Sequence, residues 1–302
     1  CLAFNKDAAE QMRERLSDLG VPCSRQRTDI GKVTVVTFNS FGLGVLNETV
    51  VRLDVLNEKE TEQLAIRVLQ NGSKALDVQI PRLRGQSPWL QLLDEMSRIK
   101  SGLVLPSEAS IEFDLKKNET LELPMSPFFN EWERVSSSQK KITFDDQIYQ
   151  PIRLLMAKSI LRSSLLKRYR HIIVDEYQDL SPSQIALLKL IASSGQQVFG
   201  VGDDDQLIYS WKEVDDSNIL EFGQMFHNMK SYPLSTNYRS AKTIVRTSQR
   251  LIKYNIKRVA KDIKPHDNNP EGKAKVFCAP AIGDQLEWII ELIKEHKSKD
   301  PK

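Results

Sequence analysis

Cysteine is scarce in this sequence. The 302 residues contain only Cys1, Cys23 and Cys278, and no CxxC pair. A disulfide framework needs paired cysteines and most zinc sites need closely spaced ones, so neither is expected, and a reducing, cytoplasmic setting fits best. No apolar run approaches the ~18 residues that suggest a transmembrane helix, so we expect no membrane association.

A large excess of charge of either sign is also missing. The formal net charge is only +3, so any affinity for nucleic acid must come from local patches. One candidate patch lies within 230–264, where five basic residues recur at helical spacing: Lys242, Arg246, Arg250, Lys253 and Lys257. Such a face either follows a row of phosphates or is simply a solvated helix surface, and the sequence leaves both open.

A phosphate-binding loop of the form GxxxxGK[ST] does not occur in these residues. The two Gly-Lys pairs, Gly31-Lys32 and Gly272-Lys273, are followed by Val33 and Ala274 and have no glycine at the required upstream position. The backbone N–H groups and lysine that usually hold a nucleotide's phosphates are therefore not supplied by any such loop here.

Two acidic clusters each follow a short apolar stretch that predicts a strand. Asp175 and Glu176 come directly after HIIV, and Asp203, Asp204, Asp205 and Gln206 come after VFGVG. In open α/β sheets ligands bind at the carboxyl ends of the strands. There, an aspartate can hold Mg²⁺ on a nucleotide's phosphates, and a glutamate can accept a proton from the attacking water.

Strand-like and helix-like stretches alternate along much of the chain, which predicts an α/β fold with a parallel sheet. We predict a helix over 5–19, a core strand over 32–38, a long basic helix over 241–264 and a strand over 273–279. Residues 48–140 differ, because helical patterns alternate there with polar, proline-containing connections, and we interpret them as a mostly helical insertion.

Several motifs in order give this sequence a family resemblance. The stretches VDEYQD (174–179), VGDDDQLIYSW (201–211) and LSTNYRS (234–240) resemble motifs II, III and IV of superfamily 1 helicases, closest to the UvrD/Rep/PcrA group. AFNKDAAEQM (3–12) and VTFNSFGLGVL (36–46) resemble motifs Ia and Ib, and FDDQI (144–148) resembles a stretch that precedes motif II.

The resemblance implies a RecA-like motor domain with a helical insertion, followed by the start of a second RecA-like domain. We expect the first motor domain at 1–47 and 141–232, the inserted helical subdomain at 48–140, and the second motor domain from 233 to 302. The hinge is expected near 231–240. The phosphate-binding loop of such motors precedes motif Ia, so it would lie upstream of Cys1.

The resemblance also implies roles for residues at the nucleotide. ATP and Mg²⁺ would be the cofactors. Asp175 would position the metal, Glu176 would be the catalytic base, and Gln206 would couple the terminal phosphate to the DNA track. Arg239 would contact the terminal phosphate and Tyr238 would stack on the adenine.

Single-stranded DNA and DNA junctions are the partners that the resemblance implies. Phe4, Tyr209 and Trp211 would stack on bases, while Thr37 and Asn39 would touch the DNA backbone. The family usually has histidine where this sequence has Asn39, so that contact keeps a donor but loses ring stacking.

The function expected is ATP-dependent DNA helicase or translocase activity, moving 3′ to 5′, in repair, replication restart or defence. Residues 1–302 alone are expected to be inactive, because they lack the phosphate-binding loop. Two alternatives stay open: the motor part of a helicase–nuclease, and a non-hydrolysing DNA-binding scaffold.

Overall fold

The structure is a computed structural model, and it describes residues 1–29, 31–48, 53–80, 87–114, 120–192, 195–206, 222–226, 229–256, 258–274 and 276–299. The chain forms two compact units, Cys1–Met229 and Lys230–Lys302. Each unit is considered by itself below. No helix among the described residues is both long enough and apolar enough to cross a membrane.

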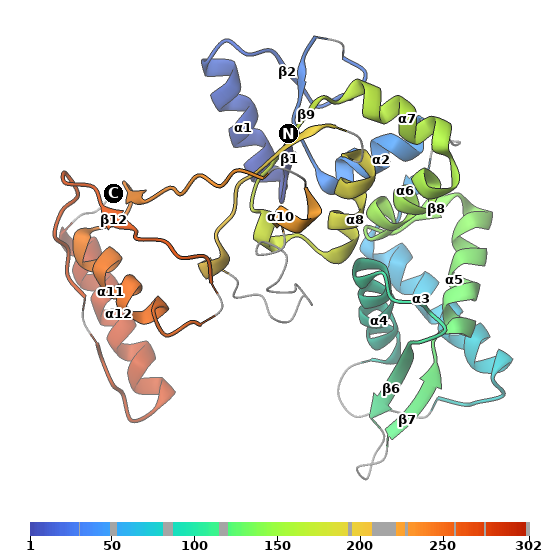
Figure 1. The fold of residues 1–302 in the computed structure, drawn as a ribbon. Coiled ribbons are helices and arrows are strands. Elements are labelled where there is room, and N and C mark those ends of the chain that lie inside the picture. The colour runs from blue at the N-terminus through green and yellow to red at the C-terminus, as the bar shows by residue number, and fades with distance from the viewer. Residues whose placement is uncertain are drawn as a thin grey trace. The chain divides into compact units, whose positions relative to one another are not determined.

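A four-stranded parallel sheet organises the first unit, in the order β10-β9-β1-β4 (Figure 1). The strands are β1 (Leu2–Ala3), β4 (Val36–Thr37), β9 (His171–Val174) and β10 (Gln197–Gly200). Val174 pairs with Leu2 on one side and with Gly200 on the other. The predicted α/β class with a parallel sheet is confirmed.

Helices cover both faces of this sheet. Successive strand residues point to opposite sides, so each face presents apolar side chains that pack against helices. Ala3 packs with Ala9 of α1 (Lys6–Asp18) in one core cluster. Leu2, on the other face, belongs to the larger cluster formed with helices α2, α6, α7 and α8. These helices span Phe38–Asn47, Asp146–Ala157, Ser159–Arg168 and Pro182–Ile191.

Residues 32–38 do not form the single core strand that their apolar character predicts. They form β3 (Val33–Thr34) and β4, which pair with different partners, since β3 lies against β2 (Cys23–Ser24) and β4 against β1. The change of partner occurs at the fully buried Val35, whose N–H donates to Ser24 O, whereas the N–H of Val36 donates to Cys1 O.

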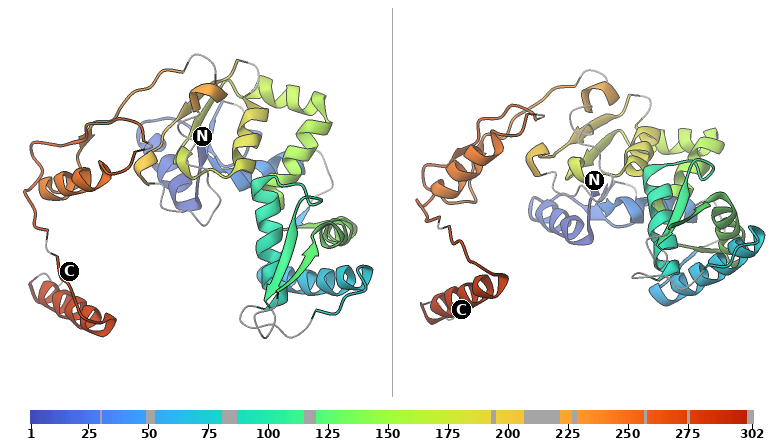
Figure 2. Two further views of the ribbon diagram at one scale, coloured as in Figure 1. Left: turned by 60° about the horizontal axis from the view of Figure 1, so that its bottom comes forward. Right: turned by 90° about the horizontal axis from the view of Figure 1, so that it is seen from below.

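The region predicted to be an insertion contains helices α3 (Glu58–Ala75), α4 (Pro88–Gly102) and α5 (Ser126–Gln139). It also contains an antiparallel hairpin that the helical patterns do not predict, made of β6 (Ser110–Asp114) and β7 (Thr120–Pro124). These elements share a core of their own, and the two views of Figure 2 show them grouped together. A short parallel pair, β5 (Asp54–Val55) with β8 (Lys141–Ile142), joins the segments that lead into and out of this region.

The second unit contains a parallel pair, β11 (Thr236–Asn237) with β12 (Lys264–Pro265), and helices α11 (Lys242–Ile252) and α12 (Ile282–Lys299). The predicted helix over 241–264 is therefore too long. After Ile252 the N–H groups of Tyr254 and Asn255 bond three residues back, which makes a turn. The chain then returns along α11, where the side chain of Gln249 donates to Ile263 O.

The predicted strand over 273–279 is wrong for the described residues of that range, which have no strand structure. A strand needs a neighbouring backbone to bond with, and apolar sequence alone does not supply one. Phe277 instead stacks on Trp288 of α12, with ring centroids 4.5 Å apart.

Candidate functional site

The carboxyl end of β9 brings the first acidic cluster to the edge of the sheet. Its buried side chains, Ile172 and Val174, alternate with exposed ones, and both buried side chains pack into the larger core cluster on one face of the sheet. The Asp175 N–H donates to Leu2 O at 3.1 Å, and the Val201 N–H donates to Val174 O at 2.9 Å. The chain segments that follow β9 and β10 therefore begin side by side.

Glu176 leaves the strand in a left-handed backbone conformation, with φ 49° and ψ 49°. This region is costly for a residue with a Cβ, and such residues concentrate at functional sites. Directly after it, the Tyr177 N–H donates to Val201 O at 2.9 Å, and the buried Tyr177 ring packs edge-on against Phe222. Burial raises the pKa of the Tyr177 hydroxyl to about 12.

Asp175 is half-buried, and its surroundings disfavour its charge. Partial burial raises the pKa of its carboxyl, and the neighbouring negative charge of Glu176 raises that pKa further. Two adjacent carboxylates at a strand end are the oxygen ligands that Mg²⁺ prefers, and a divalent cation would offset their repulsion. The residues present therefore fit a magnesium ion at Asp175.

Gln178 joins the two acidic clusters, although its sequence context alone does not indicate this role. It lies in η1 (Tyr177–Asp179), and only 1% of its surface is exposed. Its Nε2 donates to Glu176 Oε2 at 2.7 Å, and its Oε1 accepts the Asp203 N–H at 3.0 Å. The available signal was its position in DEYQD, two residues beyond the proposed base.

Gln206 lies in the turn η2 (Asp204–Gln206), close to Asp203. Its Nε2 donates to Asp203 Oδ2 at 2.7 Å, and the Asp205 N–H donates to Asp203 Oδ1 at 3.2 Å. Carboxylate oxygens of Asp203, Asp204 and Asp205 lie within 4.8 Å of one another. The structure thus brings three predicted site residues, Asp175, Glu176 and Gln206, to one edge of the sheet.

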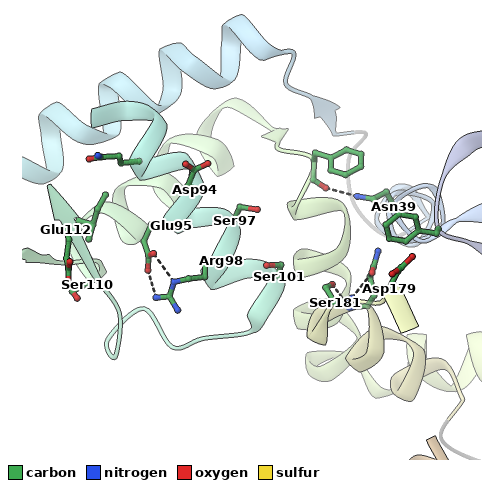
Figure 3. A pocket seen from close by; sticks show the side chains of 15 residues that line it. Asn39, Asp94, Glu95, Ser97, Arg98, Ser101, Ser110, Glu112, Asp179 and Ser181 are labelled. Carbon is green, nitrogen blue, oxygen red and sulfur yellow. Dashed lines mark hydrogen bonds and ion pairs between the residues drawn. The ribbon is translucent and has the colours of Figure 1, made fainter. Parts of the chain in front are cut away.

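A cavity of about 1080 Å³ lies beside this edge, between the parallel-sheet part of the first unit and the inserted region. Figure 3 shows Asn39, Asp179 and Ser181 on one side, and Asp94, Glu95 and Arg98 of α4 on the other. Phe4 and Phe144 also line it. Asp179 closes the DEYQD stretch, so the segment that carries the acids continues into the cavity wall.

Phe4 and Asn39 therefore line the same cavity, as two predicted DNA contacts. The side chain of Asn39 donates from Nδ2 to Phe144 O at 3.0 Å. Thr37 is placed differently: it is buried and caps α2, where its Oγ1 accepts the Ser40 N–H at 3.2 Å. Its contact with the DNA backbone stays a prediction.

Four further predicted site residues are Tyr209, Trp211, Tyr238 and Arg239. Tyr209 and Trp211 lie outside the described residues. Tyr238 and Arg239 belong to the second unit, where both are exposed. There the Tyr238 ring lies 4.6 Å from that of His266, and the Arg239 N–H donates to Asn237 Oδ1 at 3.0 Å, which shapes the turn after β11.

The basic face predicted over 242–257 is present only in part. Lys242, Arg246 and Arg250 lie on α11 and Lys253 follows its last residue, while Lys257 lies outside the described residues. Arg246 forms an exposed ion pair with Glu271 at 3.1 Å. Because α11 ends at Ile252, the face is shorter than the sequence suggests.

Comparison with known proteins points to the same family. The family profile described as UvrD/REP helicase N-terminal domain matches residues 1–227. The ATP-dependent DNA helicase PcrA of Staphylococcus aureus (strain Mu50) is 26% identical over 307 residues, and its namesake in Staphylococcus epidermidis (strain ATCC 35984) is 25% identical over 305 residues. Each alignment covers all of this chain and 40% of the relative, so the chain spans less than half the length of these proteins.

Proposed function

Since this chain belongs to the UvrD/REP helicase family, we propose that it is the part of an ATP-dependent DNA helicase that couples ATP hydrolysis to movement along single-stranded DNA. One observation carries the proposal. The acidic ends of β9 and β10 meet at one edge of the sheet, and the segment that follows Glu176 continues into a cavity lined by Phe4 and Asn39.

In this proposal Glu176 accepts a proton from the water that attacks the terminal phosphate, while Gln206 orients that water and responds to the phosphate. Asp175 holds Mg²⁺, which neutralises charge on the phosphates when it is bound. Tyr238 stacks on the adenine and Arg239 contacts the terminal phosphate, by resemblance to the family's motif IV.

DNA would be held without regard to sequence. Base–aromatic stacking contributes roughly 1–3 kcal/mol per base and works with any base, which suits a motor that moves along any strand. Phe4, Tyr209 and Trp211 are the proposed stacking residues, and Thr37 and Asn39 the proposed backbone contacts. A 3′ to 5′ direction and a preference for junctions are further proposals, which substrates with 3′ or 5′ single-stranded tails would test.

The proposal predicts ATP turnover that single-stranded DNA stimulates in the full-length protein. Glu176→Gln should lower the stimulated kcat by about a hundredfold or more, because general-base catalysis typically contributes ~10²–10⁴-fold. The matched control is Glu14→Gln, which makes the same change at an exposed residue of α1 and should leave kcat unchanged.

Stimulated turnover that survives in Glu176→Gln would exclude Glu176 as the base. A wild-type protein that binds single-stranded DNA without hydrolysing ATP would favour the scaffold alternative. DNA cleavage by the full-length protein would favour the helicase–nuclease alternative. The 302 residues alone are expected to hydrolyse ATP no faster than their Glu176→Gln variant.

A further inference from the structure

Gln178 uses both ends of its side-chain amide inside the protein. The Glu176 carboxylate can only accept hydrogen bonds, and the Asp203 N–H can only donate one. These two partners fix the orientation of the amide, with Nε2 toward Glu176 Oε2 at 2.7 Å and Oε1 toward the Asp203 N–H at 3.0 Å. At 1% exposure, water does not compete for either bond.

The backbone around Gln178 is anchored independently. Tyr177 donates its N–H to Val201 O, its ring packs on Phe222 with centroids 4.7 Å apart, and its hydroxyl contacts the Met225 sulfur at 3.3 Å. The Asp179 N–H donates to Glu176 O at 2.9 Å. The amide therefore projects from a turn whose position is already determined by packing.

The hydrogen bonds continue beyond Asp203. Its carboxylate accepts the Gln206 side chain at 2.7 Å, so bonds through Gln178 and Asp203 connect Glu176 to Gln206. A change in the position of the 203–206 turn would thus be felt at the Glu176 carboxylate.

We infer that Gln178 is a positioning residue for hydrolysis, which holds the Glu176 carboxylate in one orientation and ties it to the turn that carries Gln206. The inference rests on the proposed function. Gln178 donates a hydrogen bond to Oε2 of Glu176, so Oε1 of Glu176 is the oxygen that receives the proton of the attacking water. An amide cannot take that proton itself, so Gln178 acts through Glu176.

The first test replaces Gln178 by methionine, which has a similar length but cannot form either hydrogen bond. In the full-length protein, Gln178→Met should lower the DNA-stimulated kcat about tenfold to a hundredfold, because a small misplacement of a catalytic group costs this much. The KM for ATP should stay within about twofold. Gln197→Met, at an exposed residue at the opposite end of β10, is the matched control and should leave both constants unchanged.

Retention of kcat within about twofold in Gln178→Met would overturn the inference, and so would an effect confined to KM. The Glu176→Gln variant, measured in the same assay, distinguishes a failure of the proposed function from a failure of the role of Gln178. If Glu176→Gln keeps its stimulated turnover, the proposed function has failed. If Glu176→Gln is inactive and Gln178→Met is normal, only the role of Gln178 has failed.

A second test measures stability and not ATP turnover, so it tests the inference even if Gln178→Met does not fold. Gln178→Glu keeps an acceptor for the Asp203 N–H but sets two carboxylates against each other, so Tm should fall at pH 7. Adding Glu176→Gln restores an amide–carboxylate pair with reversed polarity, so the double variant should recover most of that Tm. If the decrease in Tm of the double variant equals the sum of the decreases in the two single variants, the inference is overturned.

Discussion

Glu176 adopts a backbone conformation that most side chains avoid. It follows β9 with left-handed φ and ψ, and its two neighbours are both anchored, since the Asp175 N–H donates to Leu2 O and the Tyr177 N–H donates to Val201 O. A left-handed conformation costs a residue with a Cβ roughly 1–2 kcal/mol, and glycine avoids that cost. The protein thus gives up stability at the residue that we propose as the base.

This strain predicts an inverted order of stability for two inactive variants. Glu176→Gly and Glu176→Ala both remove the carboxylate, but only glycine tolerates φ 49° freely. We expect the glycine variant to be more stable than the alanine variant by about 1 kcal/mol, measured by urea denaturation.

The control for this comparison is Lys189, an exposed residue inside helix α8. There glycine should be less stable than alanine, by about 1 kcal/mol, because helix interiors disfavour glycine. An alanine variant at Glu176 that is the more stable of its pair would show that this backbone conformation is not maintained.

At the scale of elements, a buried ion pair connects α4 of the inserted region to α6 of the parallel-sheet part. Lys100 Nζ lies 2.6 Å from Asp146 Oδ1, and both side chains are almost fully buried. The ammonium also lies 5.2 Å from the centre of the Trp132 ring. Asp146 Oδ2 accepts the N–H of Thr143 at 3.0 Å and its hydroxyl at 2.7 Å, so the carboxylate is well satisfied.

The two neighbouring acids at the start of α6 have opposite pKa shifts. Burial disfavours the charge of Asp146, but Lys100 and the hydrogen bonds outweigh it, so the pKa of Asp146 is lowered. Burial also raises the pKa of Asp145, and the attraction of Lys100 and a bond from Ser97 do not cancel that effect. An unfolded aspartate has a pKa of about 3.9.

The lowered pKa means that Asp146 stabilises the fold above about pH 4 and loses this contribution as the pH falls through its folded pKa. The raised pKa of Asp145 has the opposite sign, so its contribution is present below about pH 4 and is lost as the pH rises. At neutral pH, ionised Asp146 therefore favours folding and ionised Asp145 opposes it.

We therefore expect opposite results from two isosteric changes one residue apart. At pH 7, Asp146→Asn should lower the free energy of unfolding by about 3 kcal/mol, because it leaves Lys100 buried without its partner. Asp145→Asn should leave that free energy unchanged or raise it. Urea titrations at pH 7 and pH 3 check this, since the difference between the variants should shrink at pH 3; equal losses at pH 7 would contradict it.

At the scale of the whole molecule, the two units differ in how much apolar surface they bury. Among the described residues, the buried hydrophobic side chains all belong to Cys1–Met229, with the single exception of Val245. Helix α12 instead exposes five large aliphatic side chains: Ile282, Leu286, Ile289, Ile290 and Ile293. Burial of apolar surface is the main favourable term in folding, so the second unit has little to stabilise it.

This contrast predicts different behaviour of the separated units. Residues 1–229 should unfold in one cooperative thermal transition, because they contain well-packed cores in both the parallel-sheet part and the inserted region. Residues 230–302 should show no cooperative transition by calorimetry. A sharp transition in the second unit alone would show that its apolar residues pack better than their exposure indicates.

Local patterns were enough to predict the elements that depend on neighbouring residues. Helix α1 begins where Asn5 accepts the Ala8 N–H, and α8 begins with the Ser181–Gln184 capping box, which are contacts within one turn. The acids after HIIV and VFGVG could likewise be assigned to a sheet edge, because parallel strands end at the same side. The motif order then indicated the family.

Tertiary structure decided everything that needs partners distant in sequence. The change of strand partner at Val35, the end of α11 at Ile252 and the Lys100–Asp146 pair all depend on segments that fold back from elsewhere. The link from Gln178 to Asp203 spans 25 residues and appears only when β9 and β10 lie in register. The sequence by itself determined which chemistry the sheet edge carries, because residue type sets chemistry; only the folded backbone decided which of those groups touch.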